Sequence, residues 1–117
     1  GKENTNLSFN NEAVGITEYI ESNEKFDGKK INFRVMAIQP YIYTLIGNKT
    51  SPQEFVETAV IDRGAVWSYG RYMFYNNEIN DNTIYVLERD EASKELLLEK
   101  GFELEEYNEN IDILYKK

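Results

Sequence analysis

The clearest hydrophobic pattern lies in the C-terminal third of the chain. Thr83–Leu87 is a β-prone apolar run, Phe102–Tyr107 begins with alternating apolar and polar residues, and Ile111–Tyr115 alternates throughout. Between the first two runs, Glu91–Lys100 has a helical pattern with Asp90 before it as a capping residue. Strand, helix and strand in this order predict a βαβ unit, and the last run predicts a hairpin strand that closes an edge of the sheet.

The N-terminal part changes from a helical period to a strand period. Apolar residues at helical spacing predict a helix from residue 10 or 11 to about Ser22. Ile31–Ile38 first alternates and then becomes fully apolar, as in a strand buried on both faces. Tyr41–Ile46 is a second short apolar run, which is β-prone and has a helical turn as its alternative.

The central stretch contains the strongest helix-start signal in the chain. Ser51 can accept a hydrogen bond from the N–H of Glu54, and Pro52 suits the first helical position. We therefore expect a core helix over Ser51–Asp62, with four apolar residues facing inward: Phe55, Val56, Ala59 and Val60. The pattern of residues 65–77 fits a second helix, a strand, or an irregular loop broken at Gly70.

These elements predict one α/β domain over residues 10–117, preceded by a polar linker or tail at residues 1–9. We expect a small layered domain with a mixed sheet of about four to five strands, a C-terminal βαβ unit and an edge hairpin.

Composition and charge narrow the function. The chain has 117 residues and a net charge of −8. This charge argues against nucleic acid as a partner, because the chain has no excess of basic side chains to displace counterions from a phosphate backbone. The segment Glu88–Asp112 has 10 acidic and 3 basic residues, a net of −7, so the rest of the chain is nearly neutral. The absence of His and Cys excludes the serine–histidine, cysteine–histidine and zinc–thiolate chemistries. No apolar run has the roughly 18–20 residues that cross a bilayer, so we expect the chain as given to be soluble.

The candidate ligand-binding residues are aromatic and basic, and they lie between positions 63 and 75. If this segment is helical, Arg63, Trp67 and Arg71 share one face, which can stack on sugar rings and hold anionic groups. The full candidate set is Arg63, Trp67, Tyr69, Arg71, Tyr72 and Tyr75.

In the alternative, Trp67, Tyr72 and Phe74 are core residues, and the two arginines pair with Asp62 and Glu78. Asp62 has no second carboxylate near it in the sequence, as a catalytic acid–base pair would require. We expect no catalytic residue, no metal site and no cofactor. A small enzyme that uses carboxylates alone is the weakest of the functional hypotheses.

The order of several short motifs resembles a known family. G-I-T-E-Y-I-E-S-N precedes the first strand, Q-P-Y-I-Y-T-L-I-G-N follows it, and T-I-Y-V-L, K-G-F and Y-K come later. This order, over residues 14–115, resembles the soluble C-terminal domain of bacterial polytopic membrane glycosyltransferases, the dolichyl-phosphate-mannose-protein mannosyltransferase-like and aminoarabinose transferase-like enzymes.

The resemblance implies an extracytoplasmic domain, joined to the membrane by transmembrane segments upstream of this chain. The family's catalytic acids lie in a loop between early transmembrane helices, which is absent here, so no catalytic residue is carried over. It implies a domain that helps to bind a polyprenyl-phosphate sugar or its acceptor, while the parent protein is the glycosyltransferase. The alternative is a free-standing or surface-tethered module that binds carbohydrate or protein, and the sequence predicts no oligomeric state.

Overall fold

The structure is a computed structural model that describes residues 3–35, 40–48, 50–74, 76, 78–89 and 91–117. It contains these helices and strands in order: α1 (Glu3–Glu21), η1 (Glu24–Phe26), β1 (Lys30–Phe33), α2 (Pro40–Asn48), α3 (Pro52–Thr58), β2 (Val60–Asp62), β3 (Ala65–Tyr69), β4 (Tyr72–Phe74), β5 (Thr83–Glu88), α4 (Ser93–Glu99), β6 (Glu103–Glu106) and β7 (Ile111–Tyr115).

One mixed sheet organises the domain, with strand order β2-β3-β4-β1-β5-β7-β6. The central strand β1 is parallel to both β4 and β5, and the other pairs are antiparallel. The predicted α/β class and mixed sheet are confirmed, but the sheet has seven strands and not four to five. The additional strands come mainly from residues 60–74. The predicted helix covered the start of this range up to Asp62, and three alternatives were left open for residues 65–77.

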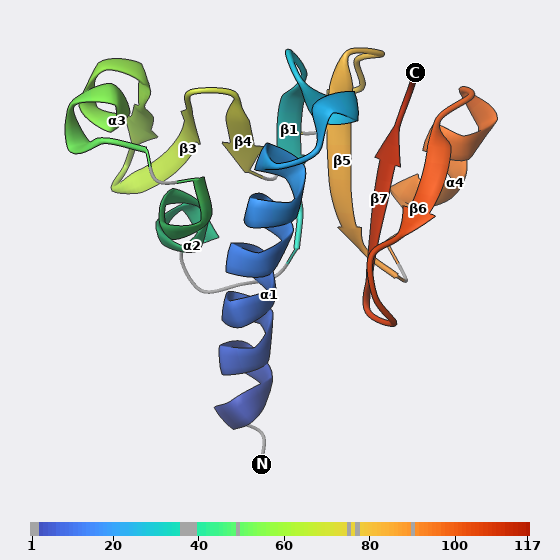
Figure 1. Ribbon diagram of the computed structural model, residues 1–117, viewed down its shortest axis with the longest axis horizontal. Helices are drawn as coiled ribbons and strands as arrows, with labels where there is room; N and C mark the ends of the chain where they lie inside the picture. Colours follow the sequence, from blue (N-terminus) through green and yellow to red (C-terminus); the bar gives the residue numbers. More distant parts are fainter. Residues whose placement is uncertain (1–2, 36–39, 49, 75, 77, 90) are drawn as a thin grey trace.

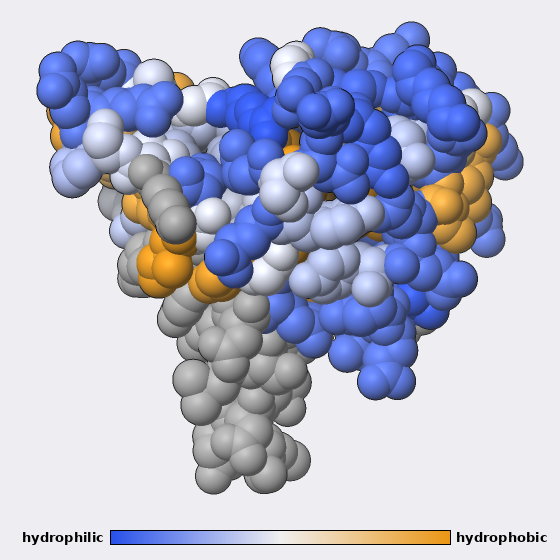
Figure 2. Space-filling model, viewed as in Figure 1, coloured by the Kyte–Doolittle hydropathy of each residue, from blue (hydrophilic) through white to orange (hydrophobic). Residues whose placement is uncertain are grey.

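The two faces of the sheet carry different cores because side chains alternate along each strand. Helices α1 and α2 lie together on one face (Figure 1), where apolar residues of β1, β4, β5 and β7 are buried against them. On the other face, Leu97 of α4 packs with Tyr85, Leu87 and Leu114. Figure 2 shows that the visible surface over β5, β7 and β6 is mostly hydrophilic.

Helices α1 and α2 approach closely at a glycine. A Cβ atom on Gly47 would lie 2.6 Å from Cβ of Thr17 and 2.8 Å from the carbonyl oxygen of Val14. Only a residue without a side chain permits this contact. The apolar run after Pro40 is helical, the alternative to the β-prone interpretation, and its helix lies against α1.

Several predicted boundaries were wrong. Helix α1 begins at Glu3, before the predicted start at residue 10 or 11, and no Pro or Gly interrupts residues 3–9. The linker or tail over residues 1–9 stays a prediction. The capped helix α3 ends at Thr58, and Val60–Asp62 is a strand. The predicted Ile31–Ile38 strand is β1, Lys30–Phe33, and residues 36–39 lie outside the described part of the chain.

The predicted C-terminal strands and helix were correct, but the prediction of which strand forms the edge of the sheet was wrong. Strands β5 and β6 run parallel, as a βαβ unit requires, because each is antiparallel to β7. However, β7 lies between them, and β6 forms the edge of the sheet. The expected helix cap Asp90 is outside the described residues, and the described helix α4 starts at Ser93.

Candidate functional site

Residues 60–74 form a three-stranded antiparallel ribbon and not a helix. Two-residue turns connect its strands, Arg63-Gly64 between β2 and β3 and Gly70-Arg71 between β3 and β4. Arg63 has φ 53°, Gly64 φ 77° and Gly70 φ 52°, the positive values that tight hairpin turns demand. The face that Arg63, Trp67 and Arg71 would share on a helix is therefore not formed.

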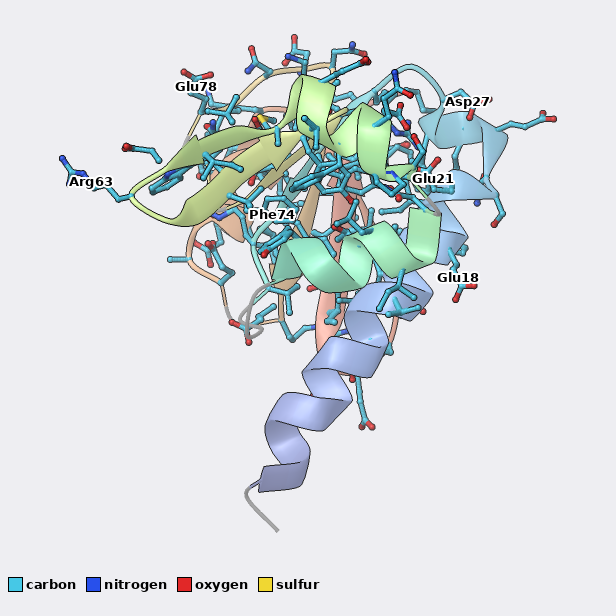
Figure 3. All side chains as sticks on the ribbon, turned by 90° about the vertical axis from the view of Figure 1, so that its left-hand side faces the viewer. Glu18, Glu21, Asp27, Arg63, Phe74 and Glu78 are labelled. Atoms are coloured by element: carbon cyan, nitrogen blue, oxygen red, sulfur yellow. The ribbon has the colours of Figure 1, made fainter. Side chains whose placement is uncertain are left out.

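The ribbon separates the candidate residues into two places. Arg63 lies at the tip of the β2–β3 hairpin, far from Glu21 in the view of Figure 3, and half of the Trp67 side chain is exposed on β3. Tyr69, Arg71 and Tyr72 lie together at the β3–β4 turn. The remaining candidate, Tyr75, is outside the described residues.

Tyr69 is the centre of an aromatic cluster. Its ring lies 5.4 Å from the rings of both Phe55 and Tyr72. Its hydroxyl donates to Oγ1 of Thr44 at 2.7 Å and accepts from Nδ2 of Asn48 at 3.0 Å. Burial raises the pKa of Tyr69 to about 12, despite these two hydrogen bonds, which lower it. Tyr69 therefore serves as a neutral, fixed floor of the site.

Arg71 and Tyr72 are held by the C-terminal end of α1. Arg71 donates from Nη2 to Oε2 of Glu21 at 3.0 Å and from Nη1 to the carbonyl oxygen of Phe26 at 2.8 Å. The hydroxyl of Tyr72 donates to the same carboxylate oxygen of Glu21. Burial, followed by this hydrogen bond, raises the pKa of the Tyr72 hydroxyl. The alternative predicted from the sequence, a pair between Arg71 and Glu78 or Asp62, was wrong.

A polar hollow of about 200 Å³ opens beside these residues. Its lining comes from the C-terminal ends of α1 and α2, the start of α3 and the β3–β4 turn: Glu21, Asn48, Thr50, Glu54, Tyr69, Gly70, Arg71 and Tyr72. Asn48 is fixed there because its Oδ1 accepts from the N–H of Thr50 at 2.9 Å. Glu54 is exposed, and its carboxylate has no hydrogen-bond partner among the described residues.

Sequence reasoning found the ribbon side of this hollow and missed the helical side. Glu21, Asn48, Thr50 and Glu54 come from positions up to 50 residues before Arg71. No local pattern marks them, apart from Glu54, whose backbone N–H makes the predicted capping hydrogen bond to Ser51 Oγ at 3.1 Å. The carboxylate of Glu54 can accept further hydrogen bonds at this hollow, whereas the guanidinium of Arg71 and the hydroxyls of Tyr69 and Tyr72 are bonded within the fold.

A second polar cluster lies on the α4 face of the sheet. Asp112 is fully buried, and its carboxylate lies 3.0 Å from Nε of Arg89 and 2.7 Å from Nζ of Lys94. Nearby, Glu91 lies 2.8 Å from Nη2 of Arg34. Burial acts to raise the pKa of Glu91, but hydrogen bonds from Ser93 and the charge of Arg34 lower it overall. These charges pair with one another, and Arg89, Glu91 and Lys94 also line a hollow of about 530 Å³.

Among the residues that the structure describes, no group of acidic side chains could hold a metal ion. Within the same residues, no helix is both long and apolar enough to cross a membrane. In the comparisons with known proteins, no family model, curated protein or solved structure matched the chain.

Proposed function

We propose that this chain is a non-catalytic binding domain that receives the sugar part of a glycan ligand in the hollow beside the β3–β4 turn. The parent would be a membrane glycosyltransferase-like protein, with the domain on the extracytoplasmic side and a polyprenyl-phosphate sugar or its acceptor as the ligand. One observation carries the proposal: Tyr69, Arg71 and Tyr72 meet Glu21 and Glu54 around one polar hollow.

The charges of the hollow select the part of the ligand that it can hold. Glu21 and Glu54 outnumber Arg71, and Arg71 is already paired with Glu21. A phosphate group in the hollow would therefore be repelled, whereas sugar hydroxyls can donate to both carboxylates. We therefore place the sugar in the hollow and the phosphate of a lipid-linked sugar outside it.

Amide-resolved NMR titration with methyl α-mannoside, methyl β-glucoside and N-acetylglucosamine tests the proposal. At least one sugar should shift the amide signals of Asn48, Thr50 and Gly70, which line the hollow. Glu54→Gln should weaken binding because it replaces a carboxylate acceptor with an amide. Glu57→Gln on the same helix is the matched control, since Glu57 pairs with Gln53 at 3.1 Å and does not line the hollow.

The proposal would be contradicted if no sugar shifts these amides, or if both variants weaken binding equally.

Because two carboxylates line one hollow, the hypothesis of a small enzyme that uses carboxylates alone can also be tested. Incubation with p-nitrophenyl glycosides should release no nitrophenol, because Glu21 is held by Arg71 and Tyr72 as a hydrogen-bond acceptor. Release that disappears in Glu54→Gln would show hydrolysis instead.

The hollow would serve a free-standing carbohydrate-binding module equally well. The gene of the parent protein separates the two contexts. About ten hydrophobic segments upstream would support the membrane glycosyltransferase, while a lone leader or lipoprotein signal would support the module.

A further inference from the structure

A further hollow lies at the C-terminal ends of α1 and α2, next to the hollow beside the β3–β4 turn. Its volume is about 610 Å³, and we call it the α1–α2 groove. Glu21 and Asn48 line both spaces, so the two adjoin at these residues. The other described residues of the groove lining are Gly15, Glu18, Tyr19, Ser22 and Gly47. A ligand in the hollow can therefore extend into the groove.

Tyr19 is the aromatic residue of the groove lining, and its ring is held in place. Its hydroxyl donates to Oε2 of Glu105 on β6. The centre of its ring lies 5.7 Å from that of Tyr107 and 6.1 Å from that of Phe26. An aromatic side chain that is already fixed loses little conformational entropy when a sugar ring packs against it.

The groove also offers carboxylate oxygens that are free to accept hydrogen bonds. Glu18 is exposed, and its carboxylate has no partner within the described part of the chain. Glu21 accepts from Arg71 and Tyr72 through Oε2, whereas no hydrogen bond from another described residue reaches its Oε1. Figure 3 shows Glu18 and Glu21 at the same end of α1. Sugar hydroxyls can donate to both groups.

The volumes indicate a ligand that is longer than one sugar unit. Small-molecule sites commonly have about 300–1,000 Å³. The hollow beside the turn, at about 200 Å³, lies below this range, and the groove, at about 610 Å³, lies within it. A single sugar unit in the hollow would leave the larger of the two spaces empty.

The charges of the groove indicate a neutral ligand. Its described lining contains two carboxylates, those of Glu18 and Glu21, and neither lysine nor arginine. A phosphate group or an acidic sugar would be repelled there, as in the hollow beside the turn. The phosphate of a lipid-linked monosaccharide therefore fits neither space, whereas the second unit of a neutral glycan fits the groove.

We infer that the ligand is a neutral oligosaccharide of at least two units, with one unit in the hollow and the next in the groove. The second unit packs on Tyr19 and donates from its hydroxyls to Glu18 and to Oε1 of Glu21. This inference rests on the proposed function, and it selects an acceptor glycan over a polyprenyl-phosphate monosaccharide as the ligand.

Amide-resolved NMR titrations of the full chain compare each monosaccharide with its disaccharide. The pairs are methyl α-mannoside with α-1,6-mannobiose, methyl β-glucoside with cellobiose, and N-acetylglucosamine with diacetylchitobiose. In at least one pair, the disaccharide should shift Thr50 and Gly70 of the hollow together with Gly15, Ser22 and Gly47 of the groove. It should bind about tenfold more tightly than its monosaccharide, the factor that one hydrogen bond to a charged acceptor supplies. Digalacturonate, which is acidic, should bind more weakly than any neutral disaccharide that binds.

Glu18→Gln should remove most of the tenfold gain of the disaccharide and leave the affinity for the monosaccharide unchanged, because Glu18 lines the groove alone. Glu54→Gln should weaken both ligands. Glu24→Gln is the matched control, since it removes the same charge from an exposed position that lines neither space. The amide spectrum of each variant shows whether the domain remains folded.

Some results would overturn this inference and leave the proposed function standing. A monosaccharide that shifts Thr50 and Gly70 while its disaccharide binds no more tightly and leaves the groove amides unchanged is one. An equal loss in Glu18→Gln and Glu24→Gln is another, since it would show a general effect of charge. Tight binding of digalacturonate would overturn the requirement for a neutral glycan. If no sugar of either length shifts any of these amides, the inference and the proposed function both fail.

Discussion

The guanidinium of Arg71 donates from Nη2 to Oε2 of Glu21, 3.0 Å away, and so joins the β3–β4 turn to the end of α1. The same side chain donates from Nη1 to the carbonyl oxygens of Phe26 at 2.8 Å and Lys29 at 3.2 Å. One arginine therefore donates hydrogen bonds to backbone carbonyl groups of the segment between α1 and β1, and it holds this segment against the ribbon.

Arg71→Ala should lower the free energy of unfolding by about 2 kcal/mol because it removes several hydrogen bonds to a charged group. Arg71→Lys should recover only part of this loss, since an ammonium group cannot reproduce the fork of contacts. Urea unfolding followed by circular dichroism measures both. A double-mutant cycle with Glu21→Gln should show coupling, and additive effects would contradict the link between these two residues.

Trp67→Ala should change the free energy of unfolding by less than about 1 kcal/mol, because half of the side chain is already in water. Tyr69→Ala should cost about 3–5 kcal/mol, since it removes a buried ring and leaves a cavity. Urea unfolding of the two variants compares the exposed and the buried aromatic of one strand. A loss for Trp67→Ala as large as that for Tyr69→Ala would place Trp67 in the core.

The sequence could predict those helices and strands whose signals come from near neighbours along the chain. Buried strands such as Thr83–Leu87 and Ile111–Tyr115 were correct because their apolar pattern is set locally. The helix start at Ser51 was correct because capping is a contact between near neighbours. The α/β class followed from such elements.

The ribbon was not predictable because its signals are ambiguous. Val60 continues the helical spacing of Val56, yet the β-branched side chains of Val60 and Ile61 also favour a strand, and pairing with β3 decides the outcome. The hollow was only half predicted, since Glu21 meets Arg71 through tertiary packing across 50 residues. No local pattern contains that information.

Gly47→Ala should destabilise the domain by about 1–3 kcal/mol, because the new Cβ would overlap Thr17 and the backbone of α1. This cost exceeds the roughly 1 kcal/mol by which alanine is preferred over glycine in a helix. Thermal unfolding measures the change. Ile46→Ala, at the adjacent and exposed position of α2, is the control and should stay within about 0.5 kcal/mol of the wild type. A stabilised Gly47→Ala variant would contradict the close approach of α1 and α2.

The free energy of unfolding should fall at alkaline pH, because Tyr69 and Tyr72 ionise more readily in the unfolded chain than in the folded domain. Burial raises the pKa of Tyr69 from 10.0 to about 12, and burial with the hydrogen bond to Glu21 raises that of Tyr72. A folded pKa above the unfolded value means that the stabilisation is complete below about pH 10 and is lost as the pH rises toward 12. Urea midpoints measured between neutral pH and this range should therefore decrease.

Tyr72→Phe removes one of the two titrations, so the decline of its urea midpoint with pH should be shallower than that of the wild type. The variant starts from lower stability because the hydrogen bond to Glu21 is gone. Parallel declines in the two proteins would show that Tyr72 is not the group responsible.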